Sequence, residues 1–393
     1  MGGLPRVLHI GTELTWRGGE QQAWLLMAGL ANAGAPQALL APARGELAVR
    51  SAAIPNLRVF ELPTGSRMHP ANWLALRRAI AAFRPQVIHA HTSHAHALAW
   101  MAAPRHLPIV ATRRVDFPLK TGRWSRRRYL SRRVHMVAIS SAIHQILASA
   151  GCPPERLHLV HSGIDASRFA DFQNAEARQE ARQALLAELC GQAGSTSTEP
   201  LLVGNVAALT DHKGQIYLIE ALGKLASVAN SSARPVLAVI AGDGELRETL
   251  EAEARRLGLL SPGASPRLEF LGYRRDVPSI MAALDVFVMP SHMEGLGTSV
   301  VDAMCMGLPV VASAAGGIPE LIRHEHNGLL VPARDPVALA VALDRMLTDP
   351  ACRSRLASQA RRDFLNGPHR SEAMVAGNLQ VYRHILAGCP ARG

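Results

Sequence analysis

Residues 281–306 read MAALDVFVMPSHMEGLGTSVVDAMCM. The apolar run 281–290, which stops at Pro290, is typical of a buried parallel strand, and the mixed segment from Thr298 to Met306 predicts a short helix that ends before Gly307. A helix that begins just after a strand offers unpaired backbone N–H groups and a partial positive charge to an anion. Glycine in the connecting turn lets the backbone approach that anion closely. The stretch therefore predicts a strand, a glycine turn with an anion site, and a helix.

Two acidic residues flank this turn. Glu294 precedes the predicted helix and Asp302 lies one turn inside it, so both carboxylates can accept hydrogen bonds from the hydroxyls of one ligand. Carboxylates suit the hydroxyls of a sugar, whereas the turn suits a phosphate, and together they indicate a nucleotide sugar. An ordinary capped helix with two solvated acids is the alternative interpretation of this segment.

The rest of the chain repeats the alternation of strand and helix. Apolar runs that predict strands cover residues 7–10, 87–91, 109–112, 136–140 and 157–161, and then 201–205, 236–241, 268–271, 286–289, 310–312 and 329–331. A polar stretch between the two series, residues 171–200, is predicted to be a linker or insertion. The expected fold is α/β, with two doubly wound Rossmann-like domains over residues 1–170 and 201–370 and the ligand at the carboxyl ends of the strands.

Composition narrows the class of protein. The 393 residues are 48% hydrophobic and 4% aromatic, and no apolar run reaches the roughly 18 residues of a membrane-spanning helix. No secretory signal is found, so a cytoplasmic location is expected. The net charge of +11 predicts an anionic partner, a phosphate or an acidic membrane surface, and no nucleic acid is expected because no nucleic-acid motif occurs. The sequence lacks GxGxxG and GxxxxGK[ST] phosphate loops, and its five cysteines lack CxxC spacing, so neither a nicotinamide cofactor nor a zinc knuckle is predicted.

Several short motifs occur in an order and spacing that are specific only together. They are Gly18-Gly19-Glu20, His89-Ala90-His91, HSGID at 161–165, AGDGELR at 241–247, FLG at 270–272, the stretch 290–304, GLPVVA at 307–312 and GIPE at 317–320. With these motifs the chain resembles, over nearly its whole length, the retaining glycosyltransferases of family 4, which have the GT-B fold. The resemblance implies two domains that face a central cleft, an acceptor domain first and a nucleotide-sugar donor domain second, and a C-terminal helix (371–388) that crosses back to the first domain.

The resemblance also implies the activity and the roles of individual residues. The activity is transfer of a sugar from a nucleoside diphosphate to an acceptor hydroxyl, with retention at the anomeric carbon and with no cofactor or required metal. Lys213 and Glu294 are the expected catalytic residues together with His91, which aligns with a histidine that touches the donor sugar. The expected donor-binding residues are Arg17, Gly18, Gly19, Tyr273, Leu296, Gly297, Thr298 and Asp302.

Two positions depart from the family pattern. Asp302 stands where the family usually has a glutamate that holds the ribose, and Ala208 stands where it usually has an arginine five residues before the lysine. Losing one charged contact to the diphosphate would cost about 1.5–3 kcal/mol if nothing replaced it. Our hypothesis is that Arg17 replaces the missing arginine, with Arg113, Arg114 and Arg274 as the competing candidates.

A histidine cluster and a basic segment allow other roles. Four histidines fall within residues 89–96, but no carboxylate or cysteine accompanies them, so a metal site is not predicted and packing or capping is the alternative. Around Trp124 and Tyr129 lie Arg123, Arg126, Arg127, Arg128, Arg132 and Arg133. This segment predicts either a surface for anionic lipid, on the inner face of the cell membrane, or an ordinary solvated helix face.

Three functions fit the sequence. The first is an active glycosyltransferase in glycolipid, lipopolysaccharide or surface polysaccharide assembly, with a glycan or lipid-linked acceptor. The second, suggested by Ala208 and Asp302, is a nucleotide-sugar-binding protein with weakened catalysis. The third is a GT-B epimerase that acts on a nucleotide sugar without an acceptor.

Overall fold

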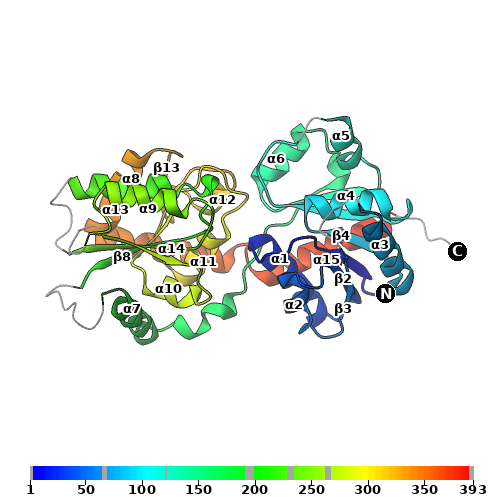
Figure 1. The fold of residues 1–393 in the computed structure, drawn as a ribbon, viewed down its shortest axis with the longest axis horizontal. Coiled ribbons are helices and arrows are strands. Elements are labelled where there is room, and N and C mark those ends of the chain that lie inside the picture. Colours follow the sequence, from blue (N-terminus) through cyan, green and yellow to red (C-terminus); the bar gives the residue numbers. More distant parts are fainter. Residues whose placement is uncertain are drawn as a thin grey trace. The chain divides into compact units, whose positions relative to one another are not determined.

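A computed structural model describes residues 3–63, 69–119, 122–190, 199–227, 234–261 and 267–388. The chain divides into two compact units (Figure 1). Unit 1 consists of residues 1–165 and 368–393, and unit 2 consists of residues 166–367. Part of the predicted linker, residues 191–198, lies outside the described residues, and the predicted domain bounds at 170 and 200 stay predictions.

Unit 1 contains a seven-stranded parallel sheet in the order β3-β2-β1-β4-β5-β6-β7. Its strands are β1 (Val7–Ile10), β2 (Gln37–Ala41), β3 (Arg58–Glu61), β4 (Val87–Ala90), β5 (Ile109–Arg113), β6 (Val134–Ala138) and β7 (Leu157–Leu159). Its helices are α1 (Gly18–Asn32), α2 (Glu46–Ser51), α3 (Pro70–Phe83), α4 (Ser93–Ala102), α5 (Arg123–Tyr129), α6 (Ser141–Ser149), the 3-10 turn η1 (Pro154–Arg156) and α15 (Ser371–Ala387). The strand order reverses between β1 and β4, so the carboxyl ends of these two strands form the switch point of the sheet.

Unit 2 contains a six-stranded parallel sheet in the order β10-β9-β8-β11-β12-β13. Its strands are β8 (Leu201–Val206), β9 (Val236–Ala241), β10 (Arg267–Gly272), β11 (Val286–Met289), β12 (Val310–Ser313) and β13 (Leu329–Val331). The helical elements are η2 (Ala166–Phe172), α7 (Ala175–Cys190), η3 (Asp211–Lys213), α8 (Gln215–Ser227), α9 (Arg247–Arg256), α10 (Val277–Ala283), α11 (Thr298–Met306), α12 (Ile318–Leu321), α13 (Pro336–Thr348) and α14 (Pro350–Asn366). The switch point of this sheet lies between β8 and β11.

The predicted fold is confirmed, and two details of the sequence analysis are wrong. The strand predicted at 286–289 is confirmed as β11, but the longer apolar run 281–290 is not all strand, because its first residues belong to α10, which ends at Ala283. Strands β2 and β3 were also missed. The edge strand β3 reads RVFE and is largely exposed, so it lacks the apolar run that marks a buried strand.

The last helix, α15, packs on α1 in unit 1, as the resemblance implies (Figure 1). Its buried residues include the apolar side chains of Met374, Val375, Val381 and Ile385. The two helices approach closely at Gly29, where a Cβ atom would lie 2.4 Å from a methyl group of Val375. The end of the chain therefore contributes to the core of unit 1.

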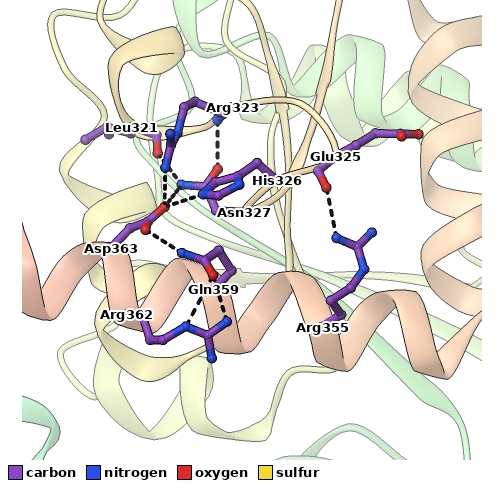
Figure 2. A network of polar contacts seen from close by, with 9 residues as sticks. All are labelled: Leu321, Arg323, Glu325, His326, Asn327, Arg355, Gln359, Arg362 and Asp363. Atoms are coloured by element: carbon purple, nitrogen blue, oxygen red, sulfur yellow. Dashed lines mark hydrogen bonds and ion pairs between the residues drawn. The ribbon is translucent and has the colours of Figure 1, made fainter.

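In unit 2, a polar network fixes the segment between α12 and β13 (Figure 2). The Asp363 carboxylate on α14 accepts hydrogen bonds from Asn327 Nδ2 at 2.8 Å, Arg323 Nη2 at 3.2 Å and Gln359 Nε2 at 2.7 Å. Burial acts to raise the pKa of Asp363, but these hydrogen bonds outweigh it and the pKa is lowered. The network thus fastens residues 323–327, which follow α12, to a long helix.

Candidate functional site

The loop after β8 carries Lys213 into the site of unit 2. Lys213 ends η3, and the next residue, Gly214, has a φ of 66°. A Cβ atom on Gly214 would lie 2.3 Å from the carbonyl oxygen of Pro290, which follows β11. Glycine is therefore required both by the backbone conformation and by the contact. The close contact brings the loop after β8 against the loop after β11.

We expect Gly214→Ala to lower the free energy of unfolding by about 2 kcal/mol or more, since alanine costs about 1–2 kcal/mol at positive φ and here also meets Pro290. Gly258→Ala is the matched control, because Gly258 has a φ of 73° and open space at the Cβ position. Urea unfolding followed by circular dichroism measures both variants. Equal losses in the two would show that the Pro290 contact contributes nothing.

The contact between the two loops brings Lys213 to Glu294. Lys213 Nζ lies 2.6 Å from Glu294 Oε2, and the two side chains are only 20% and 11% exposed. The Ser291 hydroxyl donates a second hydrogen bond to the same carboxylate oxygen at 3.3 Å. An ammonium group and a carboxylate, separated by 81 residues in the sequence, are thus held in one sheltered place at the switch point of the sheet.

The glycine turn follows directly. Gly297 is the residue before α11 and has a φ of 93°, which a residue with a side chain rarely adopts. Helix α11 then begins at Thr298, which is partly buried, whereas Leu296 is 1% exposed. Gly317 N–H donates to Glu294 O at 2.9 Å and connects the turn to the start of α12. The helix start therefore lies close in the chain to the Lys213–Glu294 pair, with its first amides available for an anion.

The second acid of this region, Asp302, lies on α11 and is buried. Burial raises the pKa of Asp302 to about 6, and the opposing charge of Arg168 lowers it only in part. Arg168 Nη1, on η2, is 3.9 Å from Asp302 Oδ1, and this oxygen has no hydrogen-bond donor in the part of the chain that the structure describes. Asp302 Oδ1 is therefore a buried acceptor that could accept a hydrogen bond from a ligand hydroxyl.

In unit 1, His91 belongs to a group of three stacked or tilted imidazoles. His9, His89 and His91 are all buried, and their ring centroids are 4.2–5.7 Å apart. His9 Nδ1 lies 2.9 Å from His91 Nε2. The ring nitrogens of His89 contact the Tyr382 hydroxyl at 2.5 Å and the Thr112 hydroxyl at 2.7 Å. Burial is the main cause that lowers the pKa of each of the three histidines.

These three histidines are the residues that could hold a metal ion. Their nearest ring nitrogens lie within 4.8 Å of one another, and they form the one such group among the described residues. His9 was not among the residues predicted from the sequence, and a metal was not predicted. In the structure, however, the nitrogens of His91 already contact His9 and Arg114, and the Arg114 guanidinium would repel a second cation.

The candidates for the missing arginine lie in different surroundings. Arg17 is exposed just before α1, where its backbone N–H donates to Glu20, and the next residues are Gly18 and Gly19. The Arg114 side chain passes beside Gly19 and donates to the carbonyl of His91 at 2.8 Å.

The other positions named from the sequence offer less. Arg113 donates to the carbonyl of Phe117. Arg274 forms ion pairs with Glu188 and Asp276, so two carboxylates already neutralise its charge. Tyr273 is 58% exposed, and Ala208 is exposed.

Three residues that touch the predicted ones were not predicted from the sequence. His9 contacts His91, Ser291 contacts Glu294, and Arg168 faces Asp302. His9 had a signal, because it is a histidine inside the apolar strand β1, which pairs with β4. Arg168 had none, since it lies on the 3-10 turn η2 at the start of unit 2, outside the strands predicted from the sequence.

Two family descriptions match this chain. The family Glycosyltransferase Family 4 matches residues 16–168, and the family Glycosyl transferases group 1 matches residues 192–363. The chain is 29% identical over 231 residues to an uncharacterized glycosyltransferase of Methanocaldococcus jannaschii, covering 58% of this chain and 54% of that protein. It is 32% identical over 186 residues to the lipopolysaccharide core biosynthesis glycosyltransferase LpsE of Rhizobium meliloti, covering 47% of this chain and 51% of that protein. The chain thus spans about half the length of these two relatives.

The fold is shared with solved structures over almost its whole length. The structure of Anabaena Alr3699/HepE in complex with UDP and glucose has a TM-score of 0.77 and 23% sequence identity, covering 98% of this chain and all of that chain (100%). Two parallel Rossmann-like sheets with a last helix packed on the first unit define the GT-B class of glycosyltransferase folds. Within that class, this protein belongs to the glycosyltransferases of group 1 and family 4.

Proposed function

We propose that this protein transfers a sugar from a nucleoside diphosphate to an acceptor hydroxyl, with retention at the anomeric carbon and without a metal ion. The contact that carries the proposal is the 2.6 Å pair of Lys213 and Glu294 beside the Gly297 turn. Rupture of the bond to the sugar leaves negative charge on the diphosphate and positive charge on the sugar ring. A cation, a helix start and a carboxylate in one place match these two developing charges.

Each group has a definite part in this proposal. The Lys213 ammonium and the first amides of α11 stabilise the departing diphosphate, and they do so without reorganising during the step. Glu294 accepts a hydrogen bond from a donor sugar hydroxyl, while Asp302 accepts from the ribose hydroxyls. Binding of the diphosphate exchanges part of the contact between Lys213 and Glu294 for a contact between Lys213 and phosphate. Since Lys213 supplies fixed positive charge, the reaction needs no divalent cation.

The relatives suggest the substrates. Anabaena HepE was solved with UDP and glucose, and LpsE of Rhizobium meliloti is named for lipopolysaccharide core biosynthesis. We propose a UDP-hexose as the donor and a glycolipid, lipopolysaccharide or surface polysaccharide precursor as the acceptor. His91 and the residues Arg17, Gly18 and Gly19 of unit 1 stay proposed donor contacts, as does the exposed Tyr273 for the base.

A panel of nucleotide sugars tests the proposal. The 393-residue protein is incubated in EDTA with each donor, with and without lipid-linked glycan acceptors, and released nucleotide and glycoside are measured. We expect transfer with one donor and an α-linked product from an α-linked donor, by NMR of the anomeric proton. Tight binding without release of nucleotide would instead identify a binding protein, and release of an altered nucleotide sugar would identify an epimerase.

We also propose that a basic surface on α5 docks the protein on the cytoplasmic face of an anionic membrane. Arg123, Arg126 and Arg127 are exposed on α5, Arg132 is exposed just after it, and Trp124 is 69% exposed. Two of the six arginines named from the sequence belong instead to the fold: Arg128 donates to Ser93 O, and Arg133 donates to Ala103 O and Pro104 O. Among the described residues, no helix is long and apolar enough to cross a bilayer, so the proposed contact is peripheral.

Vesicle flotation gives the expected result. The protein should float with vesicles of phosphatidylglycerol and phosphatidylcholine at low salt, and Arg126→Glu with Arg127→Glu should lower binding at least about 30-fold, because each arginine near the surface contributes about 1 kcal/mol. Arg44→Glu with Arg78→Glu, an equal change at two other exposed arginines, is the matched control. Absence of wild-type binding, or equal losses in both pairs, would refute the docking surface.

A further inference from the structure

A line of hydrogen-bonding groups runs through unit 1 from Arg114 toward α1. It begins where the Arg114 guanidinium meets His91 at two points: Nη1 donates to the backbone carbonyl at 2.8 Å, and Nη2 lies 3.3 Å from ring atom Nδ1. A guanidinium has only donors, so the Nδ1 atom of His91 must be the acceptor and carries no proton. Burial lowers the pKa of Arg114 to about 10, which leaves it charged at neutral pH.

The protonated nitrogen of His91 then determines which nitrogen of His9 carries a proton. Because Nδ1 accepts from Arg114, His91 cannot be the doubly protonated imidazolium, so the ring is neutral. A neutral ring without a proton on Nδ1 carries it on Nε2, which is 2.9 Å from His9 Nδ1. His9 Nδ1 must therefore accept, and the proton of a neutral His9 lies on its own Nε2. Both histidines are thereby assigned the same tautomer.

The line ends at Gln37 on β2. Within the described residues, His9 Nε2 and Gln37 Oε1 are both buried without a well-formed hydrogen bond, and one is a donor while the other is an acceptor. The two residues do interact, since the Gln37 side chain partly opposes the lowering of the pKa of His9 by burial. Gln37 Nε2 in turn donates to Met27 O on α1 at 2.6 Å. In the hydrogen bonds from Arg114 to His91, from His91 to His9 and from Gln37 to Met27, the donor therefore always lies on the side nearer Arg114.

We propose that Arg114 is a positioning residue that locks His91 as the neutral Nε2–H tautomer through this line of hydrogen bonds. The lock uses both ring nitrogens of His91. While it holds, His91 meets a ligand as a fixed, uncharged ring, and it cannot act as a general acid or base. Its link to donor binding rests on the proposed function, whereas the tautomer itself does not.

His89 supplies an internal contrast. Its two nitrogens face the hydroxyls of Tyr382 and Thr112, and each hydroxyl can donate or accept. The structure therefore assigns no tautomer to His89, although it lies in the same cluster. The assignment for His91 and His9 comes from the arginine alone.

Long-range 1H–15N NMR of the full chain with labelled histidine tests the lock. We expect His91 and His9 each to show one protonated nitrogen, identified as Nε2 by correlations to both ring protons, with His91→Gln and His9→Gln giving the assignments. A proton on Nδ1 of His91 would overturn the proposal. So would stoichiometric zinc retained by the protein as purified, with loss of the Nε2–H signals, because the three histidines would then be a metal site.

Variants of Arg114 distinguish its effect on the His91 tautomer from an effect on folding. Arg114→Met should let His91 populate the other tautomer or exchange between the two, and Arg114→Lys, which still donates, should restore the Nε2–H form. Arg113→Met, which removes the neighbouring arginine, should leave the His91 signals unchanged. An unchanged His91 tautomer in folded Arg114→Met would show that Arg114 does not position the ring. These readings need no turnover, so they stand whether or not the proposed transferase activity is found.

Discussion

Replacing Lys213 with methionine is expected to lower turnover by about 10²–10³, the loss seen when one preorganised group that stabilises a developing anion is removed. The negative charge on the diphosphate grows as the bond to the sugar breaks, so kcat should fall together with kcat/KM. Initial rates with the best donor of the nucleotide-sugar panel measure both constants. Methionine keeps much of the length of the side chain but removes the ammonium group, with its charge and its hydrogen-bond donors.

Two further variants make this result specific. Lys224→Met removes another lysine of unit 2, on α8, and should leave turnover within about two-fold of wild type, as is usual for changes away from a site. Lys213→Arg keeps the charge but changes its geometry, so only partial activity is expected. Near-normal turnover in folded Lys213→Met would show that Lys213 does not stabilise the departing diphosphate, and its contact with Glu294 would then have no role in the reaction.

The meeting of Lys213 and Glu294 could be anticipated from the sequence because it follows from topology. Both residues come after parallel strands, and in a doubly wound sheet those two strands are neighbours, as the pairing of β8 with β11 shows. The carboxyl ends of neighbouring parallel strands open at the same edge of the sheet. Gly214 then allows the loop after β8 to contact the loop after β11 closely. Its φ of 66° could not be deduced from the sequence pattern alone.

Other contacts of the site depend on geometry that the sequence does not express. His9 meets His91 across two strands, and Arg168 reaches Asp302 from a 3-10 turn after unit 1 ends. The missed edge strand β3 is similar, because its exposed residues carry no hydrophobic periodicity and only its pairing with β2 makes it a strand. Local sequence patterns therefore predict the buried strands and helices. Contacts made by edge strands and by residues outside the regular elements can be identified only in the folded structure.

Asp302→Asn is expected to stabilise the fold and to weaken donor binding at the same time. Burial raises the pKa of Asp302 from 3.8 to about 6, and this shift of about 2 units corresponds to about 3 kcal/mol. A carboxyl group whose pKa is raised by folding is stabilising below pH 3.8, and that stability is lost as the pH rises through about 6. Ionised Asp302 therefore costs up to about 3 kcal/mol near neutral pH, and neutral asparagine avoids this cost.

Urea unfolding near pH 7.5 and near pH 4 measures the effect, with circular dichroism as the signal. The variant should be more stable near pH 7.5, and its advantage should vanish near pH 4, where Asp302 is protonated in the folded protein. Tryptophan fluorescence serves as a reference, because all five tryptophans lie in residues 16–124 of unit 1. Asp171→Asn, at an exposed acid of η2, should show neither change. An advantage that is equal at both pH values would mean that the charge of Asp302 is not its source.

Donor binding should move in the opposite direction. A charged carboxylate that accepts hydrogen bonds from ribose hydroxyls contributes about 1.5–3 kcal/mol, so Asp302→Asn should weaken nucleotide-sugar affinity by roughly 10- to 100-fold in calorimetry near pH 7.5. Wild-type affinity should also fall as the pH drops below about 6, because protonation of Asp302 removes the same charge. The variant should lack this pH dependence. A stabilised variant with unchanged affinity would show that the buried carboxylate does not contact the donor, and the ribose would then need another acceptor in unit 2.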